Sequence, residues 1–126
     1  MPEPFRLFVY GHLRRGQAGY RLLALEQRTK WLGEAKVRGR LYDLGDYPGL
    51  VLGSDGIVQG ELIAFDDPTL WAALDDYEDC DPSDSEASEY RRIEVGLLGS
   101  GHAWVYVYNR PVESMAPIAS GTWQGV

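Results

Sequence analysis

The stretch that decides the fold is "RLFVYGHLRRGQAGYRLL", residues 6–23. Its apolar half reads as a buried strand over residues 5–10, and this strand stops abruptly at Gly11. A polar turn follows, and residues 18–28 then have the leucine spacing of a helix. The sequence therefore places a histidine and two arginines in a tight loop between a strand end and a helix start.

A loop of this kind is able to bind an anionic or polar ligand. Its successive backbone N–H groups can point at one ligand, and its glycines let the chain approach that ligand closely. The same residues also fit a simple tight turn whose arginines are solvated. The residues alone leave both interpretations open.

Working outward from this loop, short extended segments outnumber helices along the chain, and no strand–helix unit repeats. This order predicts an α+β fold built on a curled mixed sheet or barrel. After residues 18–28 we expect one or two strands over 31–44 that bend at Gly33 and Gly39, then a turn with a short extended piece over 45–53 and a strand over 57–65. A helix over 66–79 follows, with Asp67 as its N-cap. The chain then forms a hairpin of strands over 90–98 and 102–109 and ends in a closing segment over 115–123.

Length and composition set further bounds. The 126 residues suit a single domain, 1–126, and 44% hydrophobic residues are enough for one core. A net charge of −7 without a basic, aromatic-containing stripe argues against a nucleic-acid partner. The chain has one cysteine, no apolar run long enough for a membrane span and no secretory pattern in its first residues. We therefore expect a cytoplasmic protein without a membrane partner, either a monomer or a weak homodimer.

Residues 75–89 hold eight carboxylates and no Lys or Arg. Most of these carboxylates read as solvated, and we expect the 80–89 loop to be mobile and to add little to stability. A calcium loop starting at Asp79 fails, because it would need a glycine at its sixth position, Asp84. Glu78 differs from the other acids because it ends the amphipathic helix, where partial burial raises a carboxyl pKa toward that of a working general base.

Other kinds of site find little support in the sequence. There is no Gly-x-Ser-x-Gly nucleophile motif, and Cys80 lies among acids that disfavour its thiolate. The glycine-rich "GLLGSG" joins two strands, so it lacks the strand-then-helix context of a phosphate loop. The two histidines, His12 and His102, have no metal-ligand spacing, so we expect no metal and no cofactor.

Six motifs in order resemble the gamma-glutamylcyclotransferase-like family. They cover roughly residues 5–123 and read "FVYGHLRRGQ", "LYDLGDYPGLV", "IVQGELIAF", "LDDYED", "EYRRIEV" and "AWVYVYNRP". The resemblance implies a small mixed β-barrel with flanking helices. It also implies an enzyme that needs no cofactor and that releases 5-oxoproline and a free amine from a small γ-glutamyl amide.

The resemblance also assigns roles to residues. Glu78, in "LDDYED", matches the family's acid/base glutamate, which agrees with its choice from the residues alone. The opening loop would then be a cradle for the γ-glutamyl group, built largely from backbone N–H groups. The substrate-binding residues expected on this basis are Tyr10, Gly11, His12 and Leu13, together with Tyr90 and Tyr108 of the later motifs.

Three departures from the family pattern leave the substrate open. His12 stands where the family has Ser or Thr, Asp79 stands where it has Gly, and the 80–89 loop is long and acidic. We expect the His12 side chain to point to solvent instead of toward Glu78. Two alternatives to a cyclotransferase stay open on the same site: a non-catalytic module that binds a small metabolite, and a hydrolase of γ-glutamyl amides.

Overall fold

The computed structural model describes residues 5–99 and 101–124. Ser100, in the predicted hairpin turn, and residues 1–4 and 125–126 lie outside this description. In chain order the elements are β1 (Phe5–Val9), α1 (Ala18–Leu22), α2 (Leu25–Arg28), β2 (Lys30–Asp43), β3 (Pro48–Phe65), α3 (Leu70–Tyr77), β4 (Tyr90–Gly96), β5 (His102–Tyr108) and β6 (Ala116–Ile118).

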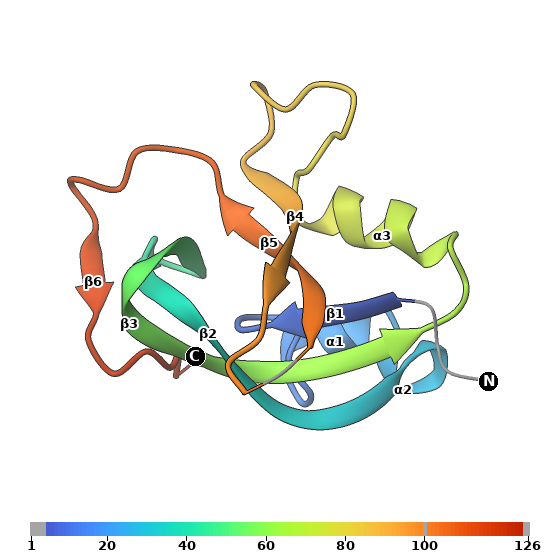
Figure 1. Ribbon diagram of the computed structural model, residues 1–126. Coiled ribbons are helices and arrows are strands. Elements are labelled where there is room, and N and C mark those ends of the chain that lie inside the picture. Colours follow the sequence, from blue (N-terminus) through green and yellow to red (C-terminus); the bar gives the residue numbers. More distant parts are fainter. Residues whose placement is uncertain (1–4, 100, 125–126) are drawn as a thin grey trace.

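The strands form one curled mixed sheet with the order β4-β5-β1-β3-β2-β6. β1 runs parallel to β5, and the other neighbouring pairs are antiparallel. The long strands β2 and β3 bend around into a half-barrel whose edges are β4 and β6 (Figure 1). The predicted α+β fold with a small mixed barrel and flanking helices is therefore confirmed, and the predicted hairpin is the β4–β5 pair.

β2 and β3 form one long hairpin that curves strongly. Their register shifts at Gly33 and again at Gly39, which confirms the bend predicted at each glycine. A Cβ atom at Gly39 would lie 2.6 Å from the carbonyl oxygen of Val51, so no side chain fits there. β3 is one strand, whereas the sequence predicted a separate short piece before residue 57. The reason is that β2 pairs with β3 on both sides of a bulge at 53–56.

Both faces of β1 are buried, which explains its unbroken apolar run. Leu7 and Val9 pack in a core that includes Leu74 of α3. Phe8 and the adjacent Tyr10 pack in a second core, inside the curl of the sheet. Because strand neighbours point to opposite faces, a strand between two cores needs apolar residues at every position. β1 therefore lies at the centre of the molecule, and the loop after it starts from a rigid support.

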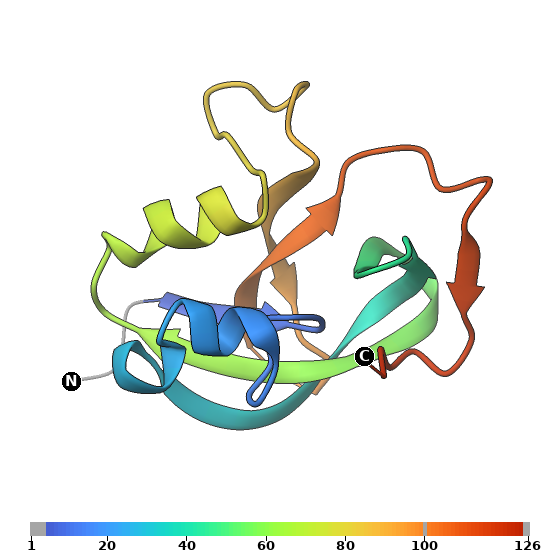
Figure 2. The same cartoon turned by 180° about the vertical axis from the view of Figure 1, so that it is seen from behind.

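The helices lie on the outer side of the curled sheet (Figure 2). Residues 18–28 form two short helices, which corrects the prediction of a single helix. Ala24 breaks the helix because its φ of 52° is left-handed, and the sequence has no glycine or proline at this position that would predict the break. Asp67 accepts the Thr69 N–H at 3.0 Å in the turn before α3, but it is not the N-cap. The N-cap is Thr69 and the helix covers Leu70–Tyr77, which corrects the predicted cap and the predicted helix over 66–79. The Leu70 N–H bonds to the Asp67 carbonyl only three residues back, so the chain before Leu70 forms a tighter turn than an α-helix. Within the described ranges, no helix is long and apolar enough to cross a membrane.

The 80–89 segment, gold in Figure 1, projects from the body of the molecule. Residues 81–87 are exposed, as expected of a solvated loop. Its C-terminal end is anchored, since Ser88 is only 2% exposed. The Asn109 side-chain amide donates to the carbonyl oxygens of Ser85 and Ser88 at 2.7 and 3.0 Å. The tip is therefore exposed, but side chains from the segment after β5 hold the loop at Ser85, Ala87 and Ser88. The small contribution of the loop to stability stays a prediction.

Candidate active site

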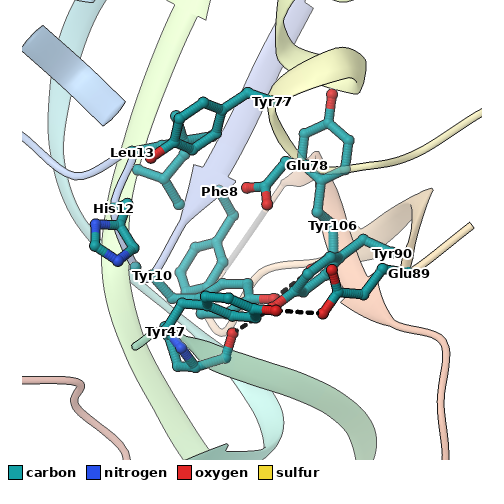
Figure 3. A pocket seen from close by; sticks show the side chains of 13 residues that line it. Phe8, Tyr10, His12, Leu13, Tyr47, Tyr77, Glu78, Glu89, Tyr90 and Tyr106 are labelled. Carbon is teal, nitrogen blue, oxygen red and sulfur yellow. Dashed lines mark hydrogen bonds between the residues drawn. The ribbon is translucent and has the colours of Figure 1, made fainter. Parts of the chain in front are cut away.

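A cavity of about 190 Å³ lies at the end of β1, between the loop after β1, the end of α3 and the start of β4 (Figure 3). Its wall is rich in tyrosine and holds two carboxylates. The lining residues are Phe8, Val9, Tyr10, Gly11, His12, Leu13, Tyr47, Pro48, Tyr77, Glu78, Glu89, Tyr90 and Tyr106. Five separate stretches of sequence thus meet at one cavity.

The C-terminal turn of α3 positions Glu78 at the cavity. The Asp79 N–H bonds to the Asp76 carbonyl at 3.3 Å and the Cys80 N–H bonds to the Asp75 carbonyl at 2.9 Å, which is the bond pair of a Schellman ending. Asp79 has a φ of 52°, the left-handed conformation that glycine adopts most easily. This geometry accounts for the glycine that the resembled family carries at this position.

The Glu78 carboxylate points into the cavity among aromatic rings, with Tyr77 and Tyr106 beside it (Figure 3). Its pKa is raised from 4.5 to about 8, first by burial and then by the negative charge of Glu89. A carboxyl with this pKa exchanges its proton near neutral pH, as a general acid/base group must.

The opening loop lines the same cavity with Gly11, His12 and Leu13. Its turn is closed by the Arg14 N–H, which donates to the Gly11 carbonyl at 3.1 Å, and the Tyr20 N–H of α1 donates to the His12 carbonyl at 3.1 Å. The N–H groups of Gly11, His12 and Leu13 make no hydrogen bond to another described residue. Three successive free donors on a cavity wall can bind a carboxylate or a developing oxyanion.

The His12 side chain turns away from Glu78 (Figure 3). Its Nε2 lies 2.8 Å from the carbonyl oxygen of Asp46, and its ring packs against Trp123 with the centroids 4.7 Å apart. The expectation that it avoids Glu78 is confirmed, whereas the expectation that it is solvated is wrong. The imidazole joins the loop after β1 to the turn between β2 and β3, so it holds the cradle in place.

The three tyrosines expected at the site have different positions. The Tyr10 hydroxyl donates to the Tyr106 carbonyl at 2.5 Å and accepts the Leu50 N–H at 3.3 Å, so it ties β5 to β3 beneath the cavity. Tyr90 lines the cavity and its hydroxyl donates to the Pro48 carbonyl at 2.7 Å. Tyr108 is not among the lining residues, which corrects its expected place at the site; its ring packs edge-on against Tyr90 with the centroids 5.4 Å apart. Burial raises the pKa of Tyr10 and Tyr90 above the usual value, so both stay protonated.

The sequence interpretation missed a second carboxylate of the wall, Glu89. The Tyr47 hydroxyl donates to Glu89 Oε2 at 2.6 Å, and this bond is the first cause of a Tyr47 pKa of about 12. The two residues are 42 positions apart, so no local spacing could reveal the pair. In the described part of the chain, no three His, Cys, Asp or Glu side chains gather as a metal ion would require.

Asp75, expected among the solvated acids, is buried. Its Oδ1 accepts the Tyr106 hydroxyl at 2.7 Å and pairs with Arg92 at 3.0 Å. The Arg92 guanidinium in turn lies over the Trp71 ring, 4.2 Å from its centroid. Asp75 therefore fixes Tyr106, whose ring forms part of the cavity wall.

The comparisons with known proteins agree with this geometry. A family model described as "Gamma-glutamyl cyclotransferase, AIG2-like" matches residues 7–125. The chain belongs to this family. A relative from Citrobacter rodentium, the gamma-glutamylcyclotransferase family protein ytfP, is 40% identical over 119 residues, which are 94% of each chain.

Two further relatives of this AIG2-like cyclotransferase family extend the comparison. A human protein named Gamma-glutamylaminecyclotransferase is 36% identical over 86 residues, 59% of this chain and 53% of the human one. The crystal structure of an AIG2-like protein from Mus musculus has a TM-score of 0.75 at 25% identity, covering 95% of this chain and 88% of the mouse chain. The family and the fold that the sequence predicted are confirmed by these matches.

Proposed function

We propose that this member of the family is a γ-glutamyl amide cyclotransferase, with Glu78 as its general base and acid. It would release 5-oxoproline and a free amine from a small γ-glutamyl amide. One observation carries the proposal: a carboxyl group with a pKa of about 8 shares a cavity with three free backbone N–H groups. The family supports the cyclotransferase class, and the name of the human relative supports an amine as the leaving group.

The chemistry assigns a step to each of these groups. The Glu78 carboxylate takes a proton from the α-ammonium of the substrate, and the freed amine attacks the γ-carbonyl carbon to form a five-membered ring. The N–H groups of Gly11, His12 and Leu13 donate to the oxyanion that forms. The amide C–N bond then breaks as Glu78 passes the proton to the leaving nitrogen. Glu78 then takes the second proton from the ring nitrogen and passes it to the departing amine, which leaves as an ammonium. The attacking nitrogen thus loses two protons and the leaving nitrogen gains two, so Glu78 ends as the carboxylate that it was at the start.

Ring closure within one molecule depends mainly on orientation. The substrate has to fold back so that its α-nitrogen meets its own γ-carbon. Rigid walls favour this folded conformer, and Tyr106 and Tyr90 are fixed by hydrogen bonds to Asp75 and Pro48. The cavity therefore suits a compact, bent γ-glutamyl group.

The test is to incubate the protein with a panel of γ-glutamyl amides and to identify the products by mass spectrometry. Release of 5-oxoproline supports a cyclotransferase, release of free glutamate supports a hydrolase, and tight binding without a product supports a binding module. Glu78→Gln is expected to lower the rate at least about a hundredfold, the usual contribution of a general base. Asp76→Asn, which changes an exposed carboxylate of the same helix, is the matched control and is expected to keep full activity.

A further inference from the structure

The mechanism above leaves one charged group of the cavity without a role. Among the lining residues in the described structure, Glu78 and Glu89 carry carboxylates and none is Lys or Arg. The His12 imidazole is directed to the Asp46 carbonyl instead. A ligand in the cavity therefore meets two carboxyl groups and no Lys or Arg.

Glu89 is held firmly but is not neutralised. The Tyr47 hydroxyl donates to its Oε2 at 2.6 Å. Its N–H donates to the Asp79 carbonyl at 2.9 Å, and its carbonyl accepts the Asn109 N–H at 2.8 Å. Among the described residues, no Lys or Arg forms an ion pair with it. A carboxylate that is fixed in position and lacks a cation is a preorganised acceptor for a positively charged group of a ligand.

The two carboxylates reach the cavity from different elements. Glu78 follows α3, and its proton transfer places the α-ammonium of the substrate beside it. Glu89 directly precedes β4, and like Glu78 it is half-buried. Because the γ-glutamyl half of the substrate is bound at Glu78 and the loop after β1, Glu89 is the carboxylate that is left to meet the amine half.

Resting on the proposed function, we infer that Glu89 is a specificity-determining residue that selects γ-glutamyl amides whose amine half carries a positive charge. An ammonium group on the amine half bonds to Glu89 while Tyr47 keeps Oε2 in place. A carboxylate at the same point meets a like charge. The strength of charge-assisted hydrogen bonds leads us to expect a preference of at least about tenfold for the cationic amide over a neutral one.

The probes are three γ-glutamyl amides of equal length: the pentyl amide, the aminobutyl amide and the carboxypropyl amide. The wild type is expected to rank them by kcat/KM as cationic, neutral, then anionic. Glu89→Gln is expected to bring the ratio of cationic to neutral within about twofold, because the charge-assisted hydrogen bond becomes an ordinary one. A ratio taken within one variant cancels any effect of Glu89 on Glu78. Glu86→Gln removes the same charge from the exposed tip and is expected to keep the wild-type ratio.

Binding to Glu78→Gln, measured by calorimetry with the same three amides, separates this inference from the proposed function. If the wild type makes no 5-oxoproline while Glu78→Gln binds the cationic amide most tightly, the cyclotransferase proposal fails and the role of Glu89 stands. If 5-oxoproline is formed and the ranking is the same in Glu89→Gln as in the wild type, the role of Glu89 is refuted and the cyclotransferase proposal stands. Equal affinity for the three amides, or no binding of any of them, also refutes the role of Glu89.

Discussion

Glu78→Gln is expected to stabilise the protein while it removes activity, and the stabilisation is expected to grow with pH. The Glu78 carboxyl has a pKa of about 8 in the folded protein and 4.5 as its ordinary value, so the folded state holds this proton more tightly. The contribution of this group to stability is therefore fully present below pH 4.5 and is lost as the pH rises through about 8. Glutamine stays neutral and suffers no such loss.

The magnitude follows from the gap between 4.5 and about 8. At about 1.4 kcal/mol per pKa unit, the upper limit is about 5 kcal/mol at high pH. The residue is half-buried and its cavity is open to water, which screens the charge, so we expect about 1–2 kcal/mol. For a domain of this size, about 1 kcal/mol shifts Tm by roughly 4 °C, which gives a gain of about 4–8 °C.

The assay is scanning calorimetry of the wild type, Glu78→Gln and the exposed control Asp76→Asn across the pH range. The Tm advantage of Glu78→Gln is expected to be near zero at about pH 4 and largest at about pH 9, on either side of the two pKa values. The control is expected to show no such trend. A Tm advantage of Glu78→Gln that is the same at every pH, or a Tm below that of the wild type at high pH, would refute the view that ionising Glu78 in this cavity destabilises the folded protein.

The remaining predictions concern the neighbours of Glu78. Glu89→Gln is expected to shift the acidic limb of the kcat/KM profile to lower pH, because the charge of Glu89 helps to raise the pKa of Glu78; an unmoved limb contradicts this. Asp79→Gly is expected to raise the free energy of unfolding by about 1 kcal/mol in urea titrations. The substitution removes the backbone strain of a left-handed aspartate and the repulsion between its carboxylate and the C-terminus of α3. A decrease would show that Asp79 makes a compensating contact. Asn109→Ala removes two hydrogen bonds to the 80–89 loop, so it is expected to lower the free energy of unfolding by about 1 kcal/mol and to speed hydrogen exchange within residues 81–89. Unchanged exchange would show that other contacts hold the base of this loop.

Much of the candidate site could be predicted because its signals are local. The strand before Gly11 has a continuous apolar run, and the turn after it follows directly in the chain. Glu78 ends an amphipathic helix, so its place at the edge of the core follows from helical periodicity. Local pattern and tertiary packing agree at these positions, which is why sequence reasoning succeeded there.

The rest of the site depends on contacts between distant segments. Tyr47 meets Glu89 only because the β2–β3 hairpin curls back to the start of β4. Asp75 reads as one more acid in an acidic run, and only the position of Arg92 and Tyr106 on β4 and β5 makes its burial favourable. Ala24 adopts its left-handed conformation through packing, without a local signal. Composition describes the acidic run on average, and it cannot tell which members the fold turns inward.

The parallel pairing of β1 with β5 has a consequence for the order of folding during synthesis. β1 can pair with β3 early, but Leu7 pairs with Trp104, so most of the chain has to be made before β1 gains its second neighbour. Pairing over such a separation is slow, because the entropy of closing a long loop is lost before the contacts form. Until β5 arrives, the apolar β1 has an open edge that another chain can join. The strand that supports the candidate site is therefore also the segment through which the nascent protein is most exposed to aggregation.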